Sequence, residues 1–505
     1  MRILYYNWVD YLDDENRGGG VTQYQRNVLK ELDRQDGIKA TFLSSGISYD
    51  LLRRVPRWEQ MRHGPAQDRH RRYEIVNSGV LSPAHHSFGQ ASQLRDDATL
   101  RALHDFIDAT GPYDVVHFNN LEGLPVQALD LKSIWPDTRV ILSLHNYYPF
   151  CPQVNLWHQE RETCTDFDQG RTCVHCLPHT HNAQQLKLAN GLAYHLKSAG
   201  LRPGSTAFEA LFRPTIKVGR RVAMGLKLLR RGGKPLPKPG RLAPLSAPDG
   251  TPFAARRAQM VQMINDHCDR VLCVSDAVGH IAERFGVRRD LLKTSYIGTA
   301  EADCFTRTRP KPSLLQSDGT FSMAYLGYMR RDKGFFFLLE ALESLPEPLA
   351  KRIRLVVAAR DIKDGTLERL SDLGARLGGL SYADGYTHDG LDDLLKNVDL
   401  GVIPVLWNDN LPQVAIEMHA RHIPLLTSDL GGAQELAHCP QMVFRAGDVE
   451  AFHARLRAIL SGQIDLAAYW AGARAPVSMP QHLDELRAVY AGSEPVSDPI
   501  PAAMP

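Results

Sequence analysis

The sequence predicts an α/β protein with two domains, each built around a parallel β-sheet. At 505 residues the chain is longer than one hydrophobic core usually supports, so we expect at least two domains. Short apolar runs typical of buried strands alternate with longer amphipathic stretches typical of helices, and this alternation favours parallel sheets. Glycine-containing turns follow several of the apolar runs, which indicates close backbone approach where strands end.

The composition excludes some classes of protein. Apolar residues make up 43% of the chain and aromatic residues 8%, as in a globular protein. The net charge of +2 does not call for a nucleic-acid partner. No apolar run reaches the roughly 18 residues that a membrane span needs, and the start lacks the basic and apolar regions of a secretory signal. We therefore expect a cytoplasmic protein whose eight cysteines are reduced.

The first predicted strand covers residues 2–8 and leads into a glycine-rich loop at 17–20. The helix that follows has apolar side chains on one face. Strand, glycine loop and helix form a common cradle for phosphate, because backbone N–H groups can approach an anion there. Gly19 and Gly20 are the candidate residues, and a plain tight turn is the alternative.

The rest of the first domain supplies one candidate for chemistry. Residues 47–100 are polar and irregular and are interpreted as an insertion. Residues 114–118 and 139–144 are two more buried strands. His145 follows the second of them, at the carboxyl end where α/β proteins place their ligands, and a strand-capping histidine is the alternative. His117 is expected to be structural.

Four cysteines gather just after His145, within 26 residues, and end in a Cys-Val-His-Cys motif. They are Cys151, Cys164, Cys173 and Cys176. Four thiolates are a donor set for a structural, tetrahedral zinc site, with His158 and His175 as substitutes. The alternatives are four reduced thiols and a disulfide pair, of which the disulfide is disfavoured in a reducing compartment.

A second insertion is expected at 180–260, and it contains a strongly basic stretch. Residues 213–241 include ten basic residues and no acidic one. Five of the basic side chains share a face of a helical wheel, although Gly219 and Gly225 weaken the helix prediction. These five are Lys217, Arg220, Arg221, Lys227 and Arg231. A basic amphipathic helix suits an anionic membrane surface, and a helix packed on its own domain is the alternative. Residues 234–248 are interpreted as a Pro/Gly linker.

The second domain is predicted to open with a strand at 321–326, a turn at Gly327 and a helix from residue 335. This order places Lys333 and the helix amino terminus where a diphosphate can bind. Arg331 is a second candidate for binding the anion. A surface cluster of basic residues is the alternative interpretation.

The stretch 398–435 carries the densest set of candidate residues. It is predicted to form a strand, a loop with Asp409, an apolar helix with Glu417, a second strand and the turn Gly431–Gly432. Both carboxylates and the glycine pair fall at the carboxyl ends of strands, where ligands sit in open α/β sheets. A solvated Glu417 is the alternative, but its flanking positions are too apolar for a wet helix face.

This stretch resembles the donor-sugar motif of the family 4 retaining glycosyltransferases, the glycosyl transferases group 1 of the GT-B fold. In that family an acidic residue precedes a glutamate with the spacing of Asp409 and Glu417. The resemblance implies that Glu417 binds the ribose of a nucleotide and that Asp409, with the backbone of Asn410 and Leu411, holds the sugar. It also implies a diphosphate site, with His145 facing the transferred sugar. The diphosphate residues are Gly19, Gly20, Gly327, Arg331, Lys333, Gly431 and Gly432.

Four positions depart from the family pattern. Asp409 replaces the usual first glutamate, and Asn146 replaces an aspartate beside His145. Tyr328 stands where an arginine contacts the diphosphate, and His422 stands where a glycine precedes a strand proline beside the donor site. A turn at 385–388 is expected near the nucleotide base.

The resemblance implies two Rossmann-like domains that face each other across a cleft. We expect an acceptor-side domain at 1–290, a donor-binding domain at 291–470, a returning helix at 471–490 and a disordered tail at 491–505. The insertion at 47–100 and the cysteine loop would lie on the acceptor side.

The implied reaction transfers a sugar from a nucleotide-diphosphate sugar to a glycan or lipid-linked glycan, with retained configuration and no metal required for catalysis. A role in cell-surface polysaccharide synthesis, at the inner face of the membrane, fits the basic helix. Two alternatives stay open. One is a nucleotide-sugar-binding scaffold without activity, and the other is a sugar-nucleotide epimerase or hydrolase on the same fold.

Overall fold

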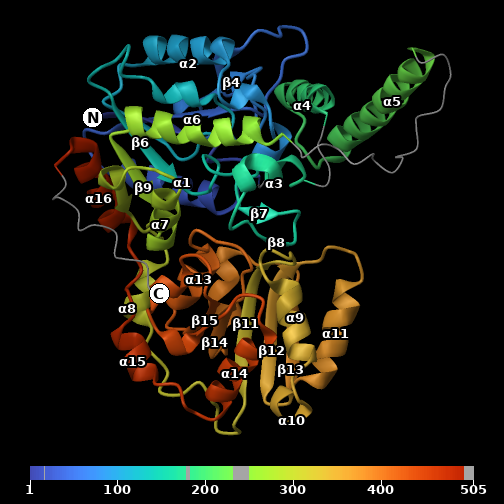
Figure 1. Cartoon of the computed structure of the whole chain (residues 1–505), viewed down its shortest axis with the longest axis vertical. Coiled ribbons are helices and arrows are strands. Elements are labelled where there is room, and N and C mark those ends of the chain that lie inside the picture. The colour runs from blue at the N-terminus through green and yellow to red at the C-terminus, as the bar shows by residue number, and fades with distance from the viewer. Residues whose placement is uncertain (16, 178–181, 231–248, 494–505) are drawn as a thin grey trace.

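A computed structural model describes the chain except for residue 16 and residues 178–181, 231–248 and 494–505. The described residues form two α/β domains, one above the other in Figure 1, each with its own sheet. The linker predicted at 234–248 and most of the predicted tail lie outside the described residues. The two-domain α/β prediction is confirmed.

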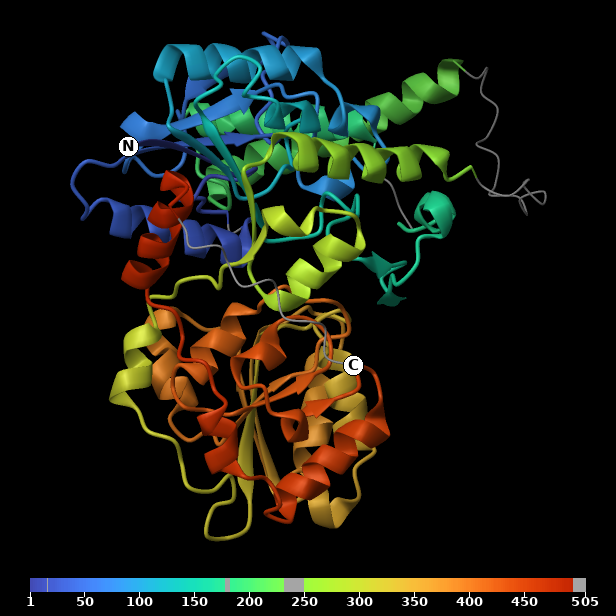
Figure 2. The ribbon, with the colours of Figure 1, turned by 60° about the vertical axis from the view of Figure 1, so that its left-hand side comes forward.

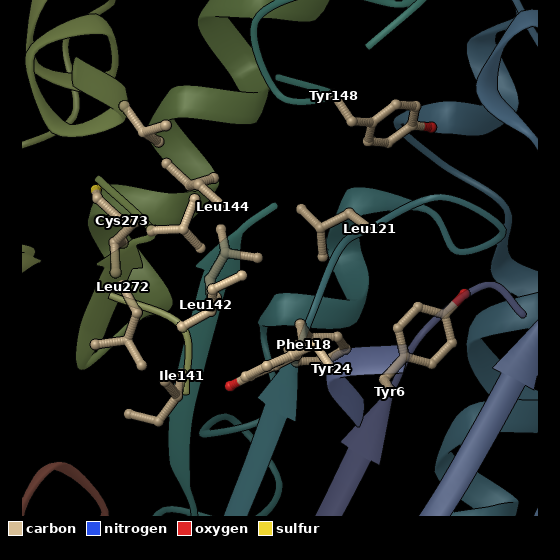
Figure 3. Close-up of a cluster of buried hydrophobic side chains, with 14 of the residues drawn as sticks. Tyr6, Tyr24, Phe118, Leu121, Ile141, Leu142, Leu144, Tyr148, Leu272 and Cys273 are labelled. Carbon is tan, nitrogen blue, oxygen red and sulfur yellow. The ribbon is translucent and has the colours of Figure 1, made fainter. Parts of the chain in front are cut away.

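The first domain contains an eight-stranded sheet in the order β10-β9-β6-β5-β1-β2-β4-β3. All neighbouring strands are parallel except the antiparallel pair β3 and β4. Buried side chains from neighbouring strands, such as Phe118, Leu142 and Leu272, pack into one core (Figure 3). The strands are β1 (Arg2–Tyr6), β2 (Lys39–Ser45), β3 (Arg57–Gln60), β4 (Arg72–Val76), β5 (Val115–Phe118), β6 (Arg139–Leu144), β9 (Arg270–Cys273) and β10 (Leu292–Thr294).

Helices and one small hairpin complete this domain. The Ser275 hydroxyl accepts a hydrogen bond from the Val278 N–H at 3.3 Å and so caps the amino terminus of α7 (Asp276–Arg284). The two-stranded hairpin is β7 (Trp157–His158) with β8 (Glu162–Thr163). Within the described part of the chain, no helix combines the length and the apolarity of a membrane span. The helices are α1 (Gly19–Leu32), α2 (Asp97–Thr110), α3 (Arg171–Val174), α4 (Ala183–Ser198), α5 (Thr206–Arg230), α6 (Thr251–His267) and α7 (Asp276–Arg284).

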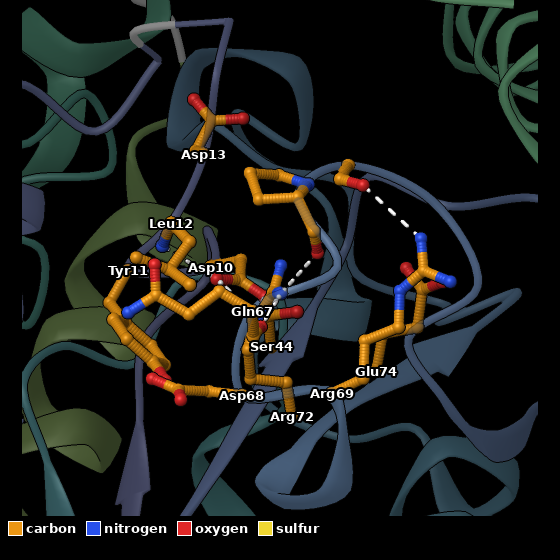
Figure 4. Close-up of polar contacts among 12 residues, drawn as sticks. Asp10, Tyr11, Leu12, Asp13, Ser44, Gln67, Asp68, Arg69, Arg72 and Glu74 are labelled. Atoms are coloured by element: carbon orange, nitrogen blue, oxygen red, sulfur yellow. Dashed lines mark hydrogen bonds and ion pairs between the residues drawn. The ribbon is translucent and has the colours of Figure 1, made fainter. Parts of the chain in front are cut away.

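Residues 47–100 were expected to be an insertion, and this was wrong, because they form the edge of the first sheet. β4 pairs with β2, and β3 pairs with β4. The polar side chains are buried in ion pairs: Arg72 Nε lies 2.8 Å from Asp10 Oδ2, with 1% of the arginine side chain exposed (Figure 4). Glu74 Oε1 lies 3.1 Å from His63 Nε2. Because charged residues occupy buried positions in these strands, the sequence lacks the alternation of apolar and polar residues that normally indicates a strand.

The second domain, below the first in Figure 2, contains its own sheet. This sheet has six parallel strands in the order β13-β12-β11-β14-β15-β16. Its strands are β11 (Phe321–Tyr328), β12 (Ile353–Arg360), β13 (Gly379–Ala383), β14 (Leu400–Ile403), β15 (Leu425–Ser428) and β16 (Val443–Phe444). Its helices are α8 (Ala302–Arg307), α9 (Phe335–Glu343), α10 (Glu347–Ala350), α11 (Thr366–Arg376), α12 (Leu391–Leu395), α13 (Gln413–His419), α14 (Val449–Leu460) and α15 (Leu466–Ala471). The first domain extends past the expected boundary at 290, since β10 pairs with β9.

The last helix, α16 (Met479–Ala491), packs on the first domain. The Tyr490 hydroxyl lies 3.0 Å from the Tyr5 hydroxyl and 2.7 Å from His117 Nδ1. His482 Nε2 lies 2.7 Å from the Tyr24 hydroxyl of α1. Helix α16, which follows the second domain in the chain, is therefore hydrogen-bonded to β1, β5 and α1 of the first domain.

Two turns of the second domain, at Gly334 and Gly431, pack closely against the loop that follows β14. A Cβ added at Gly334, which has φ +73°, would lie 1.6 Å from the carbonyl oxygen of Pro404. A Cβ added at Gly431, with φ +75°, would lie 2.0 Å from the carbonyl oxygen of Asp409. The turns after β11, β14 and β15 thus meet with no room for a side chain at either glycine.

Gly431→Ala should destabilise the second domain far more than Gly462→Ala. Both glycines have positive φ, so each alanine incurs the left-handed penalty of about 1–2 kcal/mol. Only the alanine at 431 also collides with backbone, because nothing lies within 4 Å of a Cβ at Gly462. Thermal unfolding of the two variants checks this, and equal melting temperatures would contradict the packing described for the turns.

Acidification should destabilise the protein through its buried histidines. Burial lowers the pKa of His117 and His145 to about 3 and that of His419 and His482 to about 4. Between pH 6.5 and 5 the unfolded chain binds protons on these groups that the folded chain does not, so stability falls with pH by about 1.4 kcal/mol per pH unit for each histidine. One buried carboxyl, Glu122, opposes this, because burial raises its pKa to about 7.

The melting temperature measured from pH 7 to pH 5 should therefore fall, and His482→Gln should reduce the slope. His70→Gln removes an exposed histidine and is the matched control, for which the slope should stay unchanged. A melting temperature that is flat or rises on acidification would contradict the neutral, buried state of the four histidines.

Candidate functional site

A cavity of about 710 Å³ lies between the two domains. One wall comes from the start of α1 and the end of β6, and the other comes from the carboxyl ends of β11, β12 and β14. Nine of the residues predicted to form a site line it. They are Gly19, Gly20, His145, Gly327, Lys333, Asp409, Asn410, Leu411 and Glu417.

Lys333 and Asp409 form an ion pair on the second-domain wall, with Nζ 2.6 Å from Oδ2. Lys333 lies in the turn between β11 and α9, and Asp409 lies in the loop between β14 and α13. The lysine side chain is 27% exposed and the aspartate 9%, so the pair is partly screened from water. Lys333 Nζ also lies 5.0 Å from the ring centre of Trp407. The cation is thus held at the cleft surface and can still reach an anion.

Glu417 is buried, 4% exposed, and is not a solvated helix residue. The Tyr386 hydroxyl donates a hydrogen bond to its Oε2 at 2.9 Å, and His388 Nδ1 lies 3.3 Å from its Oε1. The hydrogen bond to Glu417 raises the pKa of His388. The turn expected near a nucleotide base therefore contacts the carboxylate expected to bind the ribose.

The Gly431–Gly432 pair does not line the cleft in the described structure. The Gly432 N–H donates to the carbonyl of Asp409 at 3.0 Å, and a Cβ at Gly432 would lie 2.5 Å from Ser275 Cβ. These glycines support the Asp409 loop from behind. The Gly432 N–H is thus already hydrogen-bonded, and a role of this glycine pair at the diphosphate stays a prediction.

Arg331 is exposed and is not among the residues that line the cleft, so its role at the diphosphate stays a prediction. A different arginine, Arg360, lines the cleft at the end of β12. Arg360 pairs in register with Tyr328, the residue that stands where the family has arginine. The neighbouring strand, β12, therefore supplies an arginine beside the position where the family's arginine is replaced by Tyr328. Sequence reasoning missed Arg360, although its place at the carboxyl end of a buried strand was a usable signal.

His145 lies at the end of β6 and lines the first-domain wall. Its Nε2 lies 3.2 Å from Asn119 Oδ1, and its ring centre lies 5.0 Å from that of Tyr24. Burial, with a contribution from His482, lowers the pKa of His145 to about 3, so the ring is neutral near pH 7. Asn146 turns to Glu122 instead, donating to its Oε1 at 2.8 Å. A neutral imidazole at this position can exchange hydrogen bonds with a sugar hydroxyl.

Polar contacts join the two domains around the cleft. Gln413 Nε2 donates to the Gly20 carbonyl at 2.8 Å, and the Ser275 hydroxyl donates to the Asn410 carbonyl at 2.6 Å. The Glu435 carboxylate accepts from the N–H groups of Asp276 and Ala277 at 2.8 Å each, at the amino terminus of α7. The glycine loop and the loops after β14 and β15 are thus held in one arrangement.

His422 does not lie beside the cleft, which corrects the expectation for this residue. It has φ +53°, in the left-handed region where the family has glycine. Its Nδ1 lies 2.8 Å from the Thr308 hydroxyl, and its ring centre lies 4.1 Å from that of Phe305. It lines a separate cavity of about 280 Å³ on the second domain. The substitution therefore does not act on the donor site by contact.

The four clustered cysteines are free thiols, and three of them are buried. Burial raises the pKa of Cys173 and Cys176 to about 12, with further contributions from Cys151 and Cys164. No three of the four sulfur atoms lie within 4.8 Å of one another, so they are farther apart than the ligands of one metal ion. Among described residues, one set of three or more ligand atoms lies within 4.8 Å of one another, and Asp13, Asp14 and Glu15 form it.

The chain was compared with known proteins. Residues 320–462 match the family described as Glycosyl transferases group 1. HepE of Anabaena, solved in complex with UDP, has a TM-score of 0.54 and 13% identity, covering 97% of this chain and 100% of that chain. Sucrose-phosphate synthase of Thermosynechococcus elongatus has a TM-score of 0.53 and 14% identity, covering 97% and 98%. A glycosyltransferase of Rickettsia africae has a TM-score of 0.52 and 13% identity, covering 97% and 98%.

A search of curated proteins gives no match. The structural likenesses extend over nearly the whole chain and establish its fold, and the family match falls on the domain that carries Lys333, Asp409 and Glu417. The similarity to the glycosyl transferases group 1 family is therefore shown for residues 320–462, and the chain as a whole has the GT-B fold.

Proposed function

We propose that this protein is a glycosyltransferase that moves a sugar from a nucleotide-diphosphate sugar to a glycan or lipid-linked glycan. The observation that carries the proposal is the placement of Lys333, Asp409 and Glu417 on one wall of the interdomain cleft. These residues lie inside the segment that matches the glycosyltransferase family. HepE, which has the same fold, was solved with UDP bound.

In this proposal the donor lies along the second-domain wall. Lys333 and the amino terminus of α9 stabilise the diphosphate, and Arg360 supplies a further positive charge. Glu417 accepts hydrogen bonds from the ribose hydroxyls in place of the Tyr386 hydroxyl. Tyr386 and His388, once released from Glu417, are placed to contact the base.

The sugar lies between Asp409 and His145, which face the cleft from opposite domains. Because His145 is neutral, we assign it to hydrogen bonding with a sugar hydroxyl and not to proton donation. The acceptor enters past the start of α1, where Asp13, Glu15 and Arg26 line the cleft and offer hydrogen-bonding groups to a polyol. Lys197 of α4 lies 3.0 Å from Glu15, so the inserted helix supports this acceptor side.

The proposed reaction retains the configuration at the anomeric carbon. The bond from the anomeric carbon to the diphosphate oxygen breaks, and a bond to the acceptor hydroxyl oxygen forms on the same face. The acceptor proton passes to the leaving phosphate oxygen. Lys333 and Arg360 stabilise the charge that develops on the leaving diphosphate, which is where preorganised charge lowers the barrier.

A single assay separates this proposal from its competitors. Purified protein is incubated with radiolabelled UDP- and GDP-sugars and a membrane extract. Label in the lipid or glycan fraction supports transfer. Release of free sugar alone would indicate a hydrolase, a changed sugar nucleotide would indicate an epimerase, and binding without turnover would indicate a scaffold.

Removing the charge of Lys333 should weaken nucleotide binding. Lys333→Met is expected to weaken binding of UDP or GDP by about 10- to 100-fold, because a hydrogen bond to a charged group contributes roughly 1.5–3 kcal/mol. Glu417→Gln should weaken it by about tenfold on the same grounds. Isothermal titration calorimetry measures both effects.

The matched controls are Lys351→Met and Glu347→Gln, exposed residues of the same domain away from the cleft. Each should bind the nucleotide like the unmodified protein. If the cleft variants and the controls show equal dissociation constants, the assignment of the donor wall is refuted.

We also propose that α5 docks the enzyme peripherally on an anionic, cytoplasmic membrane face. Both views show α5 projecting away from the body of the first domain (Figures 1 and 2). Leu211 and Val218 are more than half exposed, next to the exposed Lys217 and Arg221. The predicted residues Arg220 and Lys227 and the stretch 231–241 lie outside the part of the chain whose side chains are described. A membrane site suits a lipid-linked acceptor.

Vesicle sedimentation tests the docking helix. The protein should bind vesicles of phosphatidylcholine with phosphatidylglycerol and leave pure phosphatidylcholine unbound. Lys217→Gln with Arg221→Gln should reduce binding by about tenfold or more, at about 1 kcal/mol per basic residue near the surface. Lys351→Gln with Arg376→Gln removes the same charge from the second domain, and an equal loss in this control would exclude α5 as the docking element.

A further inference from the structure

We propose that Cys151, Cys164, Cys173 and Cys176 bind one zinc ion as a structural tetrathiolate site. The proposal concerns the first domain alone and does not depend on the transferase activity. The four cysteines belong to one loop, residues 151–176, which contains the hairpin β7–β8 and the short helix α3. Backbone hydrogen bonds fold this loop back on itself: the Cys164 N–H donates to the Leu156 carbonyl at 2.7 Å, and the Gln159 N–H donates to the Cys176 carbonyl at 3.0 Å.

The backbone of this loop is unusually wound and has little regular structure to hold it. Its two strands are two residues long, and its α-helix is four residues long. Six residues other than glycine have positive φ, a conformation that costs free energy unless the surroundings impose it. They are Val154, Leu156, Gln159, Glu160, Asp168 and Gln169. A covalent or metal cross-link is the usual means of holding such a segment.

Two buried arginines lie beside the cysteines, and neither forms an ion pair within 4.0 Å of a described carboxylate. Arg256 is 4% exposed and Arg257 is 8% exposed. The buried Glu122 carboxyl interacts with Arg256 from a longer distance, but burial raises the pKa of Glu122 to about 7, so it is only partly charged near pH 7. Both cations are instead bound by carbonyl groups: Arg256 donates to Tyr148 O and Arg257 donates to Phe150 O, each at 2.8 Å. Arg257 also stacks over Phe167, with its guanidinium carbon 3.4 Å from the ring centre. A buried cation normally requires a nearby anion.

The cysteines are the groups that can supply this negative charge. Arg257 contacts the chain on both sides of the cluster, since it donates to the carbonyl of Phe150, directly before Cys151, and stacks on Phe167, which lies between Cys164 and Cys173. A zinc ion with four thiolates carries a net charge of −2, which two guanidinium groups balance. Formation of the site releases four thiol protons, since each sulfur binds the metal as a thiolate.

The surroundings of Cys176 also suit a metal ligand. Gln153 Nε2 donates to Cys176 Sγ at 2.9 Å, the kind of contact that orients thiolate ligands from outside the metal shell. The sulfurs would move closer when zinc binds, because among described residues no three of them lie within 4.8 Å of one another. Zinc would thereby tighten the loop around β7–β8.

The cysteine loop also contacts the second domain beside the interdomain cleft. The Thr163 hydroxyl, at the end of β8, donates to the Leu406 carbonyl of the second domain at 2.7 Å. Leu406 immediately precedes Trp407, which lines the cleft. A cross-linked cysteine loop would therefore hold this hairpin against the donor-side loop.

The test is metal content of the full-length protein purified under reducing conditions from cells grown with zinc. We expect about one zinc per chain, and cobalt substitution should give the intense thiolate-to-cobalt absorption of a four-sulfur site. Cys176→Ser should lose most of the zinc, while Cys439→Ser, which removes a half-buried thiol elsewhere, should retain it.

A second measurement keeps the proposal falsifiable if Cys176→Ser does not fold. Titration of the unmodified protein with a mercurial, monitored with a zinc-sensitive dye, should release one zinc as the four thiols react. Absence of zinc and of the cobalt band, or a disulfide among these cysteines in the reduced preparation, would overturn the proposal. Loss of transferase activity with normal zinc content would bear on the proposed function alone.

Discussion

The ion pair between Lys333 and Asp409 is the interaction on which the rest of the site depends. It joins the turn after β11 to the loop after β14. The backbone of Gly431, which follows β15, packs against the same loop at Asp409. Three strand ends are thereby locked at one edge of a parallel sheet, where helix amino termini and strand ends already favour anions. The lysine is held in place without a ligand, so an anion that bound there would meet a fixed positive charge, and little side-chain entropy would be lost.

The first domain completes the cleft through polar contacts that a sliding of the domains would break. Gln413 binds the glycine loop, Ser275 binds Asn410, and Glu435 caps α7. Helix α16 adds a buried tether, with Tyr490 and His482 bound to tyrosines of the first domain. His482 also contributes to the low pKa of His145, so the tether that fixes the domains helps keep the cleft histidine neutral.

The strand–turn–helix units and most of the cleft residues were predictable because their signals are local. Lys333, Asp409 and Glu417 each follow an apolar strand at a fixed spacing, and the shared carboxyl edge of a parallel sheet brings them together. β3 and β4 were not predictable, because Arg72, Glu74 and His63 are buried in pairs that only the fold reveals. Arg360 follows an apolar strand and so carried a local signal, but its pairing with Tyr328 depends on the register between two strands, which no single segment encodes. The roles of Gly431–Gly432 and His422 required the backbone angles.

The central claim is that the second-domain wall of the cleft binds the diphosphate and ribose of an activated sugar. A crystal structure of the protein with whichever of UDP, GDP and ADP binds most tightly tests it most directly. The account predicts diphosphate oxygens within hydrogen-bonding distance of Lys333 and Arg360, and ribose hydroxyls on Glu417 with Tyr386 displaced. A nucleotide bound elsewhere, with the Lys333–Asp409 and Tyr386–Glu417 contacts unchanged, would contradict it.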